Sequence, residues 1–287
     1  MPLSTDRFKL LHSLVNGQSS DVISIQDRGL LYGDGCFETL RVNAGKPLLL
    51  DAHIARLEEA CTALSIDLDI DLLSKEFSTL LASNSPQGVL KIIVTRGSGG
   101  RGYRPDPNAA SSRIVQFFDY PTDYQQKQNA GVEIMQCLHR LASSRALAGL
   151  KHLNRLDQVL ASRELVEPFD EGLCLDQAGN VIEATRSNLL LVLEGRLITP
   201  DLSECGVKGI MLQYLRRRFS ESGIEIHSRI VKPEEIAGAQ EIFLCNSVFG
   251  VWPVIKLLGN ATVTSWSVGA TTLQAIQYNN ELLGPAS

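Results

Sequence analysis

Apolar runs of strand length alternate with amphipathic helical segments in both halves of this chain, and this alternation limits the fold more than any other feature. In the first half, residues 50–66 have apolar side chains at helical spacing with Asp51 as the expected N-cap, and residues 88–103 read as a buried strand running into a glycine-rich loop. In the second half, residues 172–200 read as consecutive strands and residues 209–223 as a helix. This mixture predicts an α/β (α+β) fold.

A polar stretch near the middle of the chain predicts a boundary between two domains. Residues 121–130, "PTDYQQKQNA", show no apolar period and read as an interdomain linker. We therefore expect a small N-terminal α/β domain over residues 1–120 and a larger C-terminal domain over residues 131–287. Two domains also fit the length of 287 residues, at roughly 100–200 residues per domain.

Charge and cysteine usage argue against several classes of protein. The net charge of −5 provides no global basic field for nucleic acid or an anionic membrane, so an anionic ligand must be held by local groups. No stretch approaches the ~18 apolar residues that span a bilayer, and the N-terminus does not resemble a secretory signal, so we expect a cytoplasmic protein. The six cysteines form no CxxC pair, which argues against a metal site and a disulfide framework.

The most glycine-rich loop covers residues 96–103, "RGSGGRGY". No GK[ST] follows it, and it lacks the GxGxxG of dinucleotide-binding loops. It carries Arg96, Arg101 and Tyr103 on a flexible backbone, a combination that can hold a carboxylate because arginine binds carboxylates bidentately. The alternative is a solvated hairpin tip.

Two further features can contribute to a ligand site. Two glycines precede the helix of residues 209–223, so the N–H groups of Ile210 and Met211 lack intrahelical acceptors and can attract a phosphate. The alternative is an ordinary junction between a loop and a helix. Glu183 shares a strand face with a valine, and a half-buried carboxylate needs a cationic or hydrogen-bonding partner. The alternative is an exposed edge position.

Taken in order, these segments resemble the fold-type IV pyridoxal-phosphate enzymes, which include branched-chain and D-amino-acid aminotransferases and the aminodeoxychorismate lyases. The resemblance covers nearly the whole chain, and the pairing of "RGSGGRGY" with "KHLNRL" favours the lyases. It implies a two-domain fold with a β-barrel-like sheet in the C-terminal domain, an active site between the domains, and a homodimer. The matching stretches are "DRGLLYGDGCFETLRV", "HIARL", "GVLKIIVTRGSGGRGY", "GLKHLNRLDQVL", "EATRSNLLLV", "GVKGIM" and "LCNSVFGVWPV".

The resemblance also implies roles for individual residues. Lys151, which by itself would be an ordinary solvated lysine ahead of a helix, corresponds to the catalytic lysine that forms the Schiff base with pyridoxal 5'-phosphate. Glu183 corresponds to the carboxylate that pairs with the pyridine nitrogen. Expected phosphate-binding residues are Arg56, Ile210, Met211, Asn246 and Ser247, and expected substrate-binding residues are Arg96, Arg101, Tyr103 and Glu38.

The implied activity is a lyase reaction that converts 4-amino-4-deoxychorismate to 4-aminobenzoate and pyruvate in folate biosynthesis. An aminotransferase of the same fold type, acting on D- or branched-chain amino acids, is the first alternative. A binding protein that keeps the fold without catalysis is the second. The presence of both Lys151 and Glu183 argues against it, because a cofactor-free relative has no chemical need for either residue.

Overall fold

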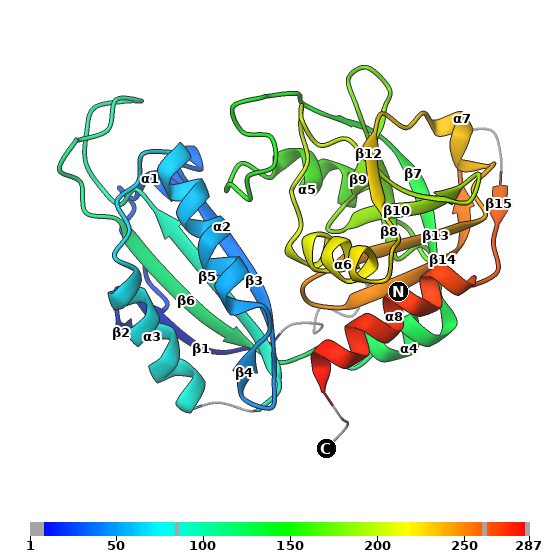
Figure 1. Ribbon diagram of the computed structural model, residues 1–287. Coiled ribbons are helices and arrows are strands. Elements are labelled where there is room, and N and C mark those ends of the chain that lie inside the picture. The colour runs from blue at the N-terminus through cyan, green and yellow to red at the C-terminus, as the bar shows by residue number, and fades with distance from the viewer. Residues whose placement is uncertain (1–8, 84–85, 260–262, 285–287) are drawn as a thin grey trace. The chain divides into compact units, whose positions relative to one another are not determined.

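The structure is a computed structural model and describes residues 9–83, 86–259 and 263–284. It divides into two compact units (Figure 1). The first consists of Met1–Thr122 and Lys151–Asn154, and the second of Asp123–Leu150 and Arg155–Ser287. Each unit combines a sheet with helices, which confirms the predicted mixed α/β class.

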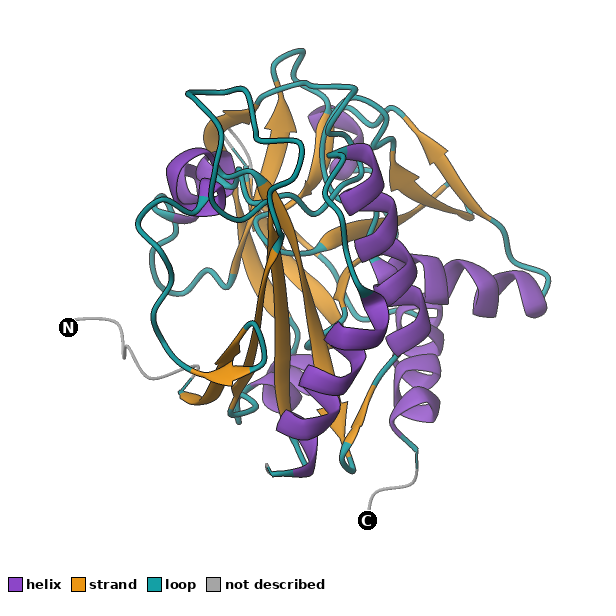
Figure 2. Cartoon of the chain, turned by 90° about the vertical axis from the view of Figure 1, so that its left-hand side faces the viewer, coloured by secondary structure: helices purple, strands orange, loops and turns teal. Residues whose placement is uncertain are grey.

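An antiparallel sheet forms the first unit, in the order β2-β1-β6-β5-β3-β4. Its helices α2 and α3 lie on one side of the strands (Figure 1; Figure 2). The strands are β1 (Leu10–Val15), β2 (Gln18–Ser19), β3 (Gly35–Asn43), β4 (Lys46–Pro47), β5 (Gly88–Thr95) and β6 (Ser112–Phe118). The helices are α1 (Arg28–Tyr32), α2 (Leu50–Ala63) and α3 (Ile70–Ala82).

The strand period decides which face of this sheet is buried. Alternate residues of β3 are buried, among them Glu38 and Leu40, because successive side chains of a strand point to opposite faces. The register places Leu40 opposite Leu90, and Leu90 opposite Phe117, so these apolar side chains form one continuous layer. Glu38 is therefore a carboxylate in a largely apolar layer, and it needs partners there.

A mixed sheet forms the second unit, in the order β12-β11-β10-β13-β14-β7-β8-β9, with β15 paired to β14. β9, at one end of this order, also packs against β10 and β11, so the sheet curls on itself. Its strands are β7 (Val132–Leu141), β8 (Glu171–Asp176), β9 (Val181–Ala184), β10 (Asn188–Leu193), β11 (Arg196–Pro200), β12 (Ile226–Arg229), β13 (Glu241–Asn246), β14 (Gly250–Leu258) and β15 (Val263–Ser265). Its helices are α4 (Tyr124–Ala130), α5 (Leu156–Ser162), α6 (Ile210–Glu221), α7 (Pro233–Ile236) and α8 (Ala270–Leu283).

The segment expected to be a linker, residues 121–130, contains helix α4 and packs into the second unit. Tyr124 and Gln128 are its buried residues, and the indole N–H of Trp252 donates to the Tyr124 carbonyl at 3.2 Å. Tyr124 and Gln128 lie one helical turn apart, and Gln128 is polar. The buried face of this short helix therefore gives no apolar period in the sequence. The segment is a docked helix rather than a free linker.

No helix in the described part of the chain is both long and apolar enough to cross a membrane.

Candidate active site

Lys151 is held on extended backbone beside β3 in the first unit. Its carbonyl accepts a hydrogen bond from Phe37 N at 2.9 Å, and Leu153 N donates to Gly35 O at 2.9 Å. The Lys151 ammonium lies 4.4 Å from the centroid of the Phe37 ring, a cation–π distance. Lys151 therefore has a backbone anchored to a sheet strand, unlike a solvated lysine at the start of a helix.

A buried ionic cluster joins Glu38 on β3 to two residues of α2. Arg56 donates to both carboxylate oxygens of Glu38, from Nε at 2.7 Å and from Nη2 at 2.6 Å. His53 Nδ1 lies 2.6 Å from Glu38 Oε2. Burial by itself would raise the pKa of Glu38, but the hydrogen bonds from His53 and Arg56 lower it to about 2. Glu38 is thus ionised and fixes the plane of the Arg56 guanidinium.

His53 is a member of this cluster that the sequence interpretation did not include. Burial lowers the pKa of His53, the hydrogen bond to Glu38 opposes this, and the charges of Arg56 and Lys151 lower it further. The ring is therefore neutral, with Nδ1–H donating to Glu38. Its position three residues before Arg56, one helical turn away, is the signal that could have placed it on the same face of α2.

Glu183 lies on β9 of the second unit and is 4% exposed, so the alternative of an exposed edge position is wrong. Its Oε2 accepts from Val207 N at 2.9 Å, and Gln158 Nε2 lies 3.5 Å from its Oε1. Gly206 adopts φ +85°, and a Cβ there would come within 3.3 Å of Glu183 Oε2. The glycine therefore lets the backbone approach a buried carboxylate that is suited to a cationic partner.

Helix α6 begins at Ile210, as the two glycines before it predict. Its N-cap is Gly209, which supplies no side-chain hydrogen bond to the first turn. A Cβ on Gly209 would lie 1.9 Å from Asn188 Oδ1, so only glycine fits without displacing Asn188. Ser187 directly precedes Asn188, and its hydroxyl is buried and has no hydrogen-bond partner among the described residues. A helix N-terminus without a side-chain cap and a buried hydroxyl donor are both features that suit a phosphate.

Asn246 and Ser247 lie at the end of β13. The Asn246 side chain accepts from Val248 N and Phe249 N, both at 2.9 Å, and donates to Arg186 O at 3.1 Å. Asn246 therefore shapes the turn that carries Ser247. Contact of either residue with a cofactor stays a prediction.

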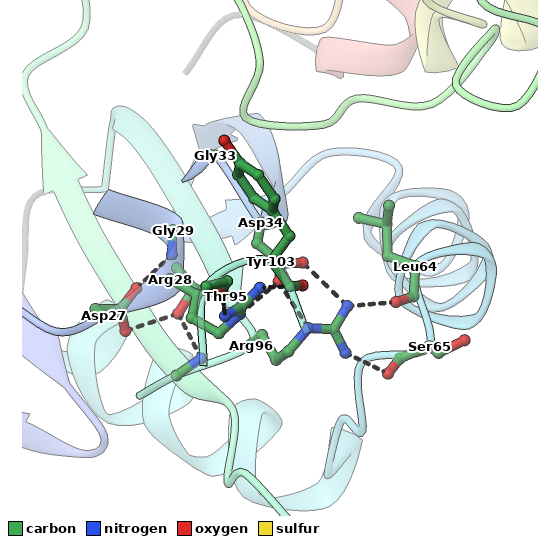
Figure 3. A network of polar contacts seen from close by, with 12 residues as sticks. Asp27, Arg28, Gly29, Gly33, Asp34, Leu64, Ser65, Thr95, Arg96 and Tyr103 are labelled. Atoms are coloured by element: carbon green, nitrogen blue, oxygen red, sulfur yellow. Dashed lines mark hydrogen bonds and ion pairs between the residues drawn. The ribbon is translucent and has the colours of Figure 1, made fainter. Parts of the chain in front are cut away.

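Arg96 has a different environment from the one expected of a substrate-binding residue (Figure 3). Its Nε and Nη2 donate to the two carboxylate oxygens of Asp34 at 2.7 and 3.0 Å. Nη2 and Nη1 also donate to Leu64 O and Ser65 O at 2.6 and 2.7 Å. Because the guanidinium fork is occupied by these acceptors, Arg96 ties the glycine-rich loop's base to the end of α2.

Arg101 and Tyr103 are exposed on the glycine-rich loop. Tyr103 is 86% exposed, and its ring meets Tyr32 of α1 edge to face with 5.5 Å between centroids. Their role in substrate binding stays a prediction, and both side chains are accessible to a ligand.

Comparison with known proteins places these features in one family. The model of the family described as "Amino-transferase class IV" matches residues 35–257. The chain belongs to this family.

The similar proteins include aminodeoxychorismate lyases and an aminotransferase. The chain is 30% identical to an aminodeoxychorismate lyase of Vibrio harveyi, over 90% of this chain and 96% of the relative. It is 45% identical, with a TM-score of 0.89, to the crystal structure of 4-amino-4-deoxychorismate lyase from Pseudomonas aeruginosa, which covers 94% of this chain and 98% of the other. A D-alanine aminotransferase of Bacillus licheniformis is 28% identical over 90% of this chain and 92% of the relative.

The residues of each unit fit pyridoxal phosphate, the cofactor implied by the resemblance. That cofactor requires an amine for its aldehyde, a carboxylate for its ring nitrogen and donors for its phosphate. The first unit contains Lys151 and the anchored cation of Arg56. The second contains buried Glu183, the start of α6 without a side-chain cap, and the Ser187 hydroxyl, for which the described residues supply no partner.

Proposed function

We propose that this chain is a pyridoxal-phosphate-dependent carbon–oxygen lyase that converts 4-amino-4-deoxychorismate to 4-aminobenzoate and pyruvate, a step of folate biosynthesis. The observation that carries this proposal is the 45% identity and TM-score of 0.89, over 94% of the chain, to a structure named as that lyase. The family match and the Vibrio harveyi relative support the same class of enzyme.

Each candidate residue has a task in this reaction. When bound, pyridoxal phosphate supplies an aldehyde for the substrate's amine and a ring that takes up electrons. Glu183 would favour a proton on the ring nitrogen, and Arg56 and the first turn of α6 would each offer donors to the phosphate. Lys151 would hold the aldehyde of the resting cofactor, and its amine would act as a base when it is not so engaged.

Proton transfer by Lys151 then completes the reaction. The Lys151 amine takes the proton from the ring carbon that bears the substrate's amine. The protonated Lys151 would then give this proton to the methylene of the enolpyruvyl group, while the bond between the ether oxygen and the neighbouring ring carbon breaks. Pyruvate leaves and the ring becomes aromatic, so the atoms of the substrate are all accounted for in the two products.

Product release from freshly prepared 4-amino-4-deoxychorismate tests this function. We expect 4-aminobenzoate fluorescence to rise together with one equivalent of pyruvate, faster when pyridoxal phosphate is added to protein that lacks it. Protein that carries the cofactor but forms neither product would contradict the lyase assignment.

The second candidate function is transamination of D- or branched-chain amino acids. It is favoured by the D-alanine aminotransferase relative and by a protein of Methanocaldococcus jannaschii named as a putative branched-chain-amino-acid aminotransferase, which is 29% identical over 87% of this chain. Conversion of the bound cofactor to its amine form by D-alanine or a branched-chain amino acid, followed by absorbance, distinguishes this activity from the lyase.

We further propose a homodimer. In the first unit, large apolar side chains are exposed on and near α1: Ile25 is 81%, Leu30 62% and Leu31 52% exposed. Exposed apolar side chains gathered in one segment are typical of protein interfaces. Light scattering should give about twice the chain mass of 31.4 kDa.

A cytoplasmic location stays a prediction, which cell fractionation tests.

A further inference from the structure

The guanidinium of Arg28 reaches from the start of α1 to the tip of the glycine-rich loop (Figure 3). Nη1 donates to Gly102 O at 2.9 Å, and Nη2 donates to Tyr103 O at 2.9 Å. Nε donates to Asp34 Oδ2 at 3.0 Å. Arg28 is 4% exposed although the loop residues it holds are exposed, so a buried cation anchors a surface loop through two backbone carbonyls.

Asp34 holds this guanidinium in place. Burial by itself would raise the pKa of Asp34, but hydrogen bonds from Arg96 and Arg28 outweigh it and the pKa is lowered. The carboxylate is therefore ionised at neutral pH and lies between two arginines. Arg96 is itself bound to the carbonyls at the end of α2, so Arg28 is connected through Asp34 and Arg96 to that helix.

The backbone of Arg28 is equally fixed. Asp27, which is fully buried, caps α1 by accepting from Gly29 N at 2.8 Å. Its other oxygen accepts from the hydroxyls of Thr95 and Ser112, both at 2.8 Å. Arg28 N donates to Gly97 O at 2.8 Å. The start of α1 is thus tied to both strands that flank the loop.

The loop tip has little else to define its conformation. Gly100 and Gly102 have φ of +90° and +58°, values that cost glycine little and leave the backbone adaptable. The other hydrogen bonds described for residues 100–104 are those between the backbones of Arg101 and Arg104, at 3.0 and 3.3 Å. The two bonds from Arg28, together with the edge-to-face contact of the Tyr103 ring with Tyr32, therefore decide how the tip lies on the unit.

We propose that Arg28 is the positioning residue for substrate recognition, because it fixes the loop that presents Arg101 and Tyr103 to the ligand. An exposed guanidinium next to an exposed aromatic ring suits an unsaturated six-membered ring that carries carboxylates. This inference rests on the proposed lyase function, and it adds a residue that touches the loop and not the substrate.

Limited trypsin digestion tests the anchoring directly, because the Arg101–Gly102 bond lies at the loop tip. In Arg28→Ala we expect cleavage at this bond, identified by mass spectrometry, to be roughly 10-fold faster than in the wild type. Arg113→Ala is the matched control: Arg113 is also a largely buried arginine of the first unit, paired with Glu76 at 2.8 Å. Equal cleavage rates in Arg28→Ala and the wild type would overturn the anchoring.

Steady-state kinetics of the holoenzyme test the effect on recognition. Arg28→Lys keeps the charge but cannot form the two-pronged contact, so we expect KM to rise about 10-fold with kcat within about twofold and the bound-cofactor absorbance unchanged. Arg113→Lys should leave all three unchanged. An unchanged KM in Arg28→Lys and Arg28→Ala, or a loss confined to kcat, would overturn the proposed role.

A double variant separates action through the loop from an independent effect. If Arg28 acts through Tyr103, then Arg28→Lys combined with Tyr103→Ala should raise KM by less than the product of the single effects. Multiplicative effects would overturn this coupling. A wild-type enzyme that releases no 4-aminobenzoate would overturn the lyase function and the recognition role together, while the trypsin result would still decide the anchoring.

Discussion

At the scale of single residues, the same side chain type has different tasks that depend on which acceptors surround it. Arg56 and Arg96 both bind a carboxylate with two nitrogens. Arg96 also binds two backbone carbonyls, so it acts as a tie within its unit. Glu38 was expected to contact substrate, but in the structure its two oxygens hold Arg56 and His53. Its position in the apolar layer under α2 accounts for this, because a buried carboxylate must be paired.

The depressed pKa of Glu38 makes stability depend on pH. Because its folded pKa of about 2 lies below the ordinary glutamate value of 4.5, its contribution is fully present above about pH 4.5 and is lost as the pH falls toward 2. In Glu38→Gln, we expect the free energy of unfolding at pH 7 to fall by about 3 kcal/mol, with a shallower decline in acid than the wild type. Urea unfolding between pH 7 and pH 3 measures both, and parallel curves for the two proteins would refute this explanation.

Lys151 and Lys91 both place their ammonium groups near the Phe37 ring, at 4.4 and 5.7 Å from its centroid. Lys91 therefore serves as the control for the assignment of Lys151. In Lys151→Ala we expect no covalently bound cofactor and a turnover at least about a thousandfold lower. Lys91→Ala is the control and should keep the covalent cofactor. Borohydride reduction followed by peptide mass spectrometry measures the attachment, and cofactor fixed to Lys91 would contradict the assignment.

At the scale of elements, glycines mark the start of α6 more reliably than an acidic residue marks the start of α2. Helix α6 begins at Ile210 after Gly209, as predicted. The expected N-cap of α2, Asp51, instead lies in its first turn, and the N-cap is Leu49 with φ +54°. Only Leu48 and Leu49 separate β4 from α2, so the short connection leaves no room for Asp51 to precede the helix.

A methyl group at Gly209 tests the start of α6. Gly209→Ala must displace Asn188, whose side chain holds Val207 O at 2.9 Å. We expect a loss of about 1–3 kcal/mol in stability and a roughly 10-fold weaker affinity for pyridoxal phosphate. Gly238→Ala is the control, because its new Cβ would meet nothing closer than 3.5 Å. Cofactor titration followed by fluorescence, with thermal unfolding, gives both values, and wild-type affinity in Gly209→Ala would contradict a phosphate site here.

At the scale of the whole molecule, the chain passes between its two units more than once. Lys151–Asn154 belongs to the first unit, while the segments on both sides of it belong to the second. The candidate catalytic lysine is therefore carried by one unit while its chain neighbours belong to the other. This differs from the boundary drawn from the sequence, where residues 131–287 form one domain.

Cofactor binding should stabilise the whole molecule. A ligand that binds only the folded state adds about 2.7 kcal/mol when present at 100 times its Kd. We expect pyridoxal phosphate to raise the melting temperature of cofactor-free wild-type protein, and to raise that of Lys151→Ala less. Calorimetry with and without cofactor measures the difference, and an unchanged melting temperature in the wild type would argue against cofactor binding.

The sequence by itself determined the mixed α/β class, the start of α6 and the family resemblance, because periodicity, glycines before a helix and short motifs are local properties of the chain. Only the tertiary structure decided that residues 121–130 form a docked helix, that Arg96 is bound within its unit, and that Glu38 is paired with His53 and Arg56. These outcomes depend on contacts between distant segments: Arg96 meets Leu64 from 32 residues away, and Arg28 meets Gly102 from 74. A buried charge is paired by whichever groups the fold brings within about 3 Å, and sequence spacing does not reveal which groups those are.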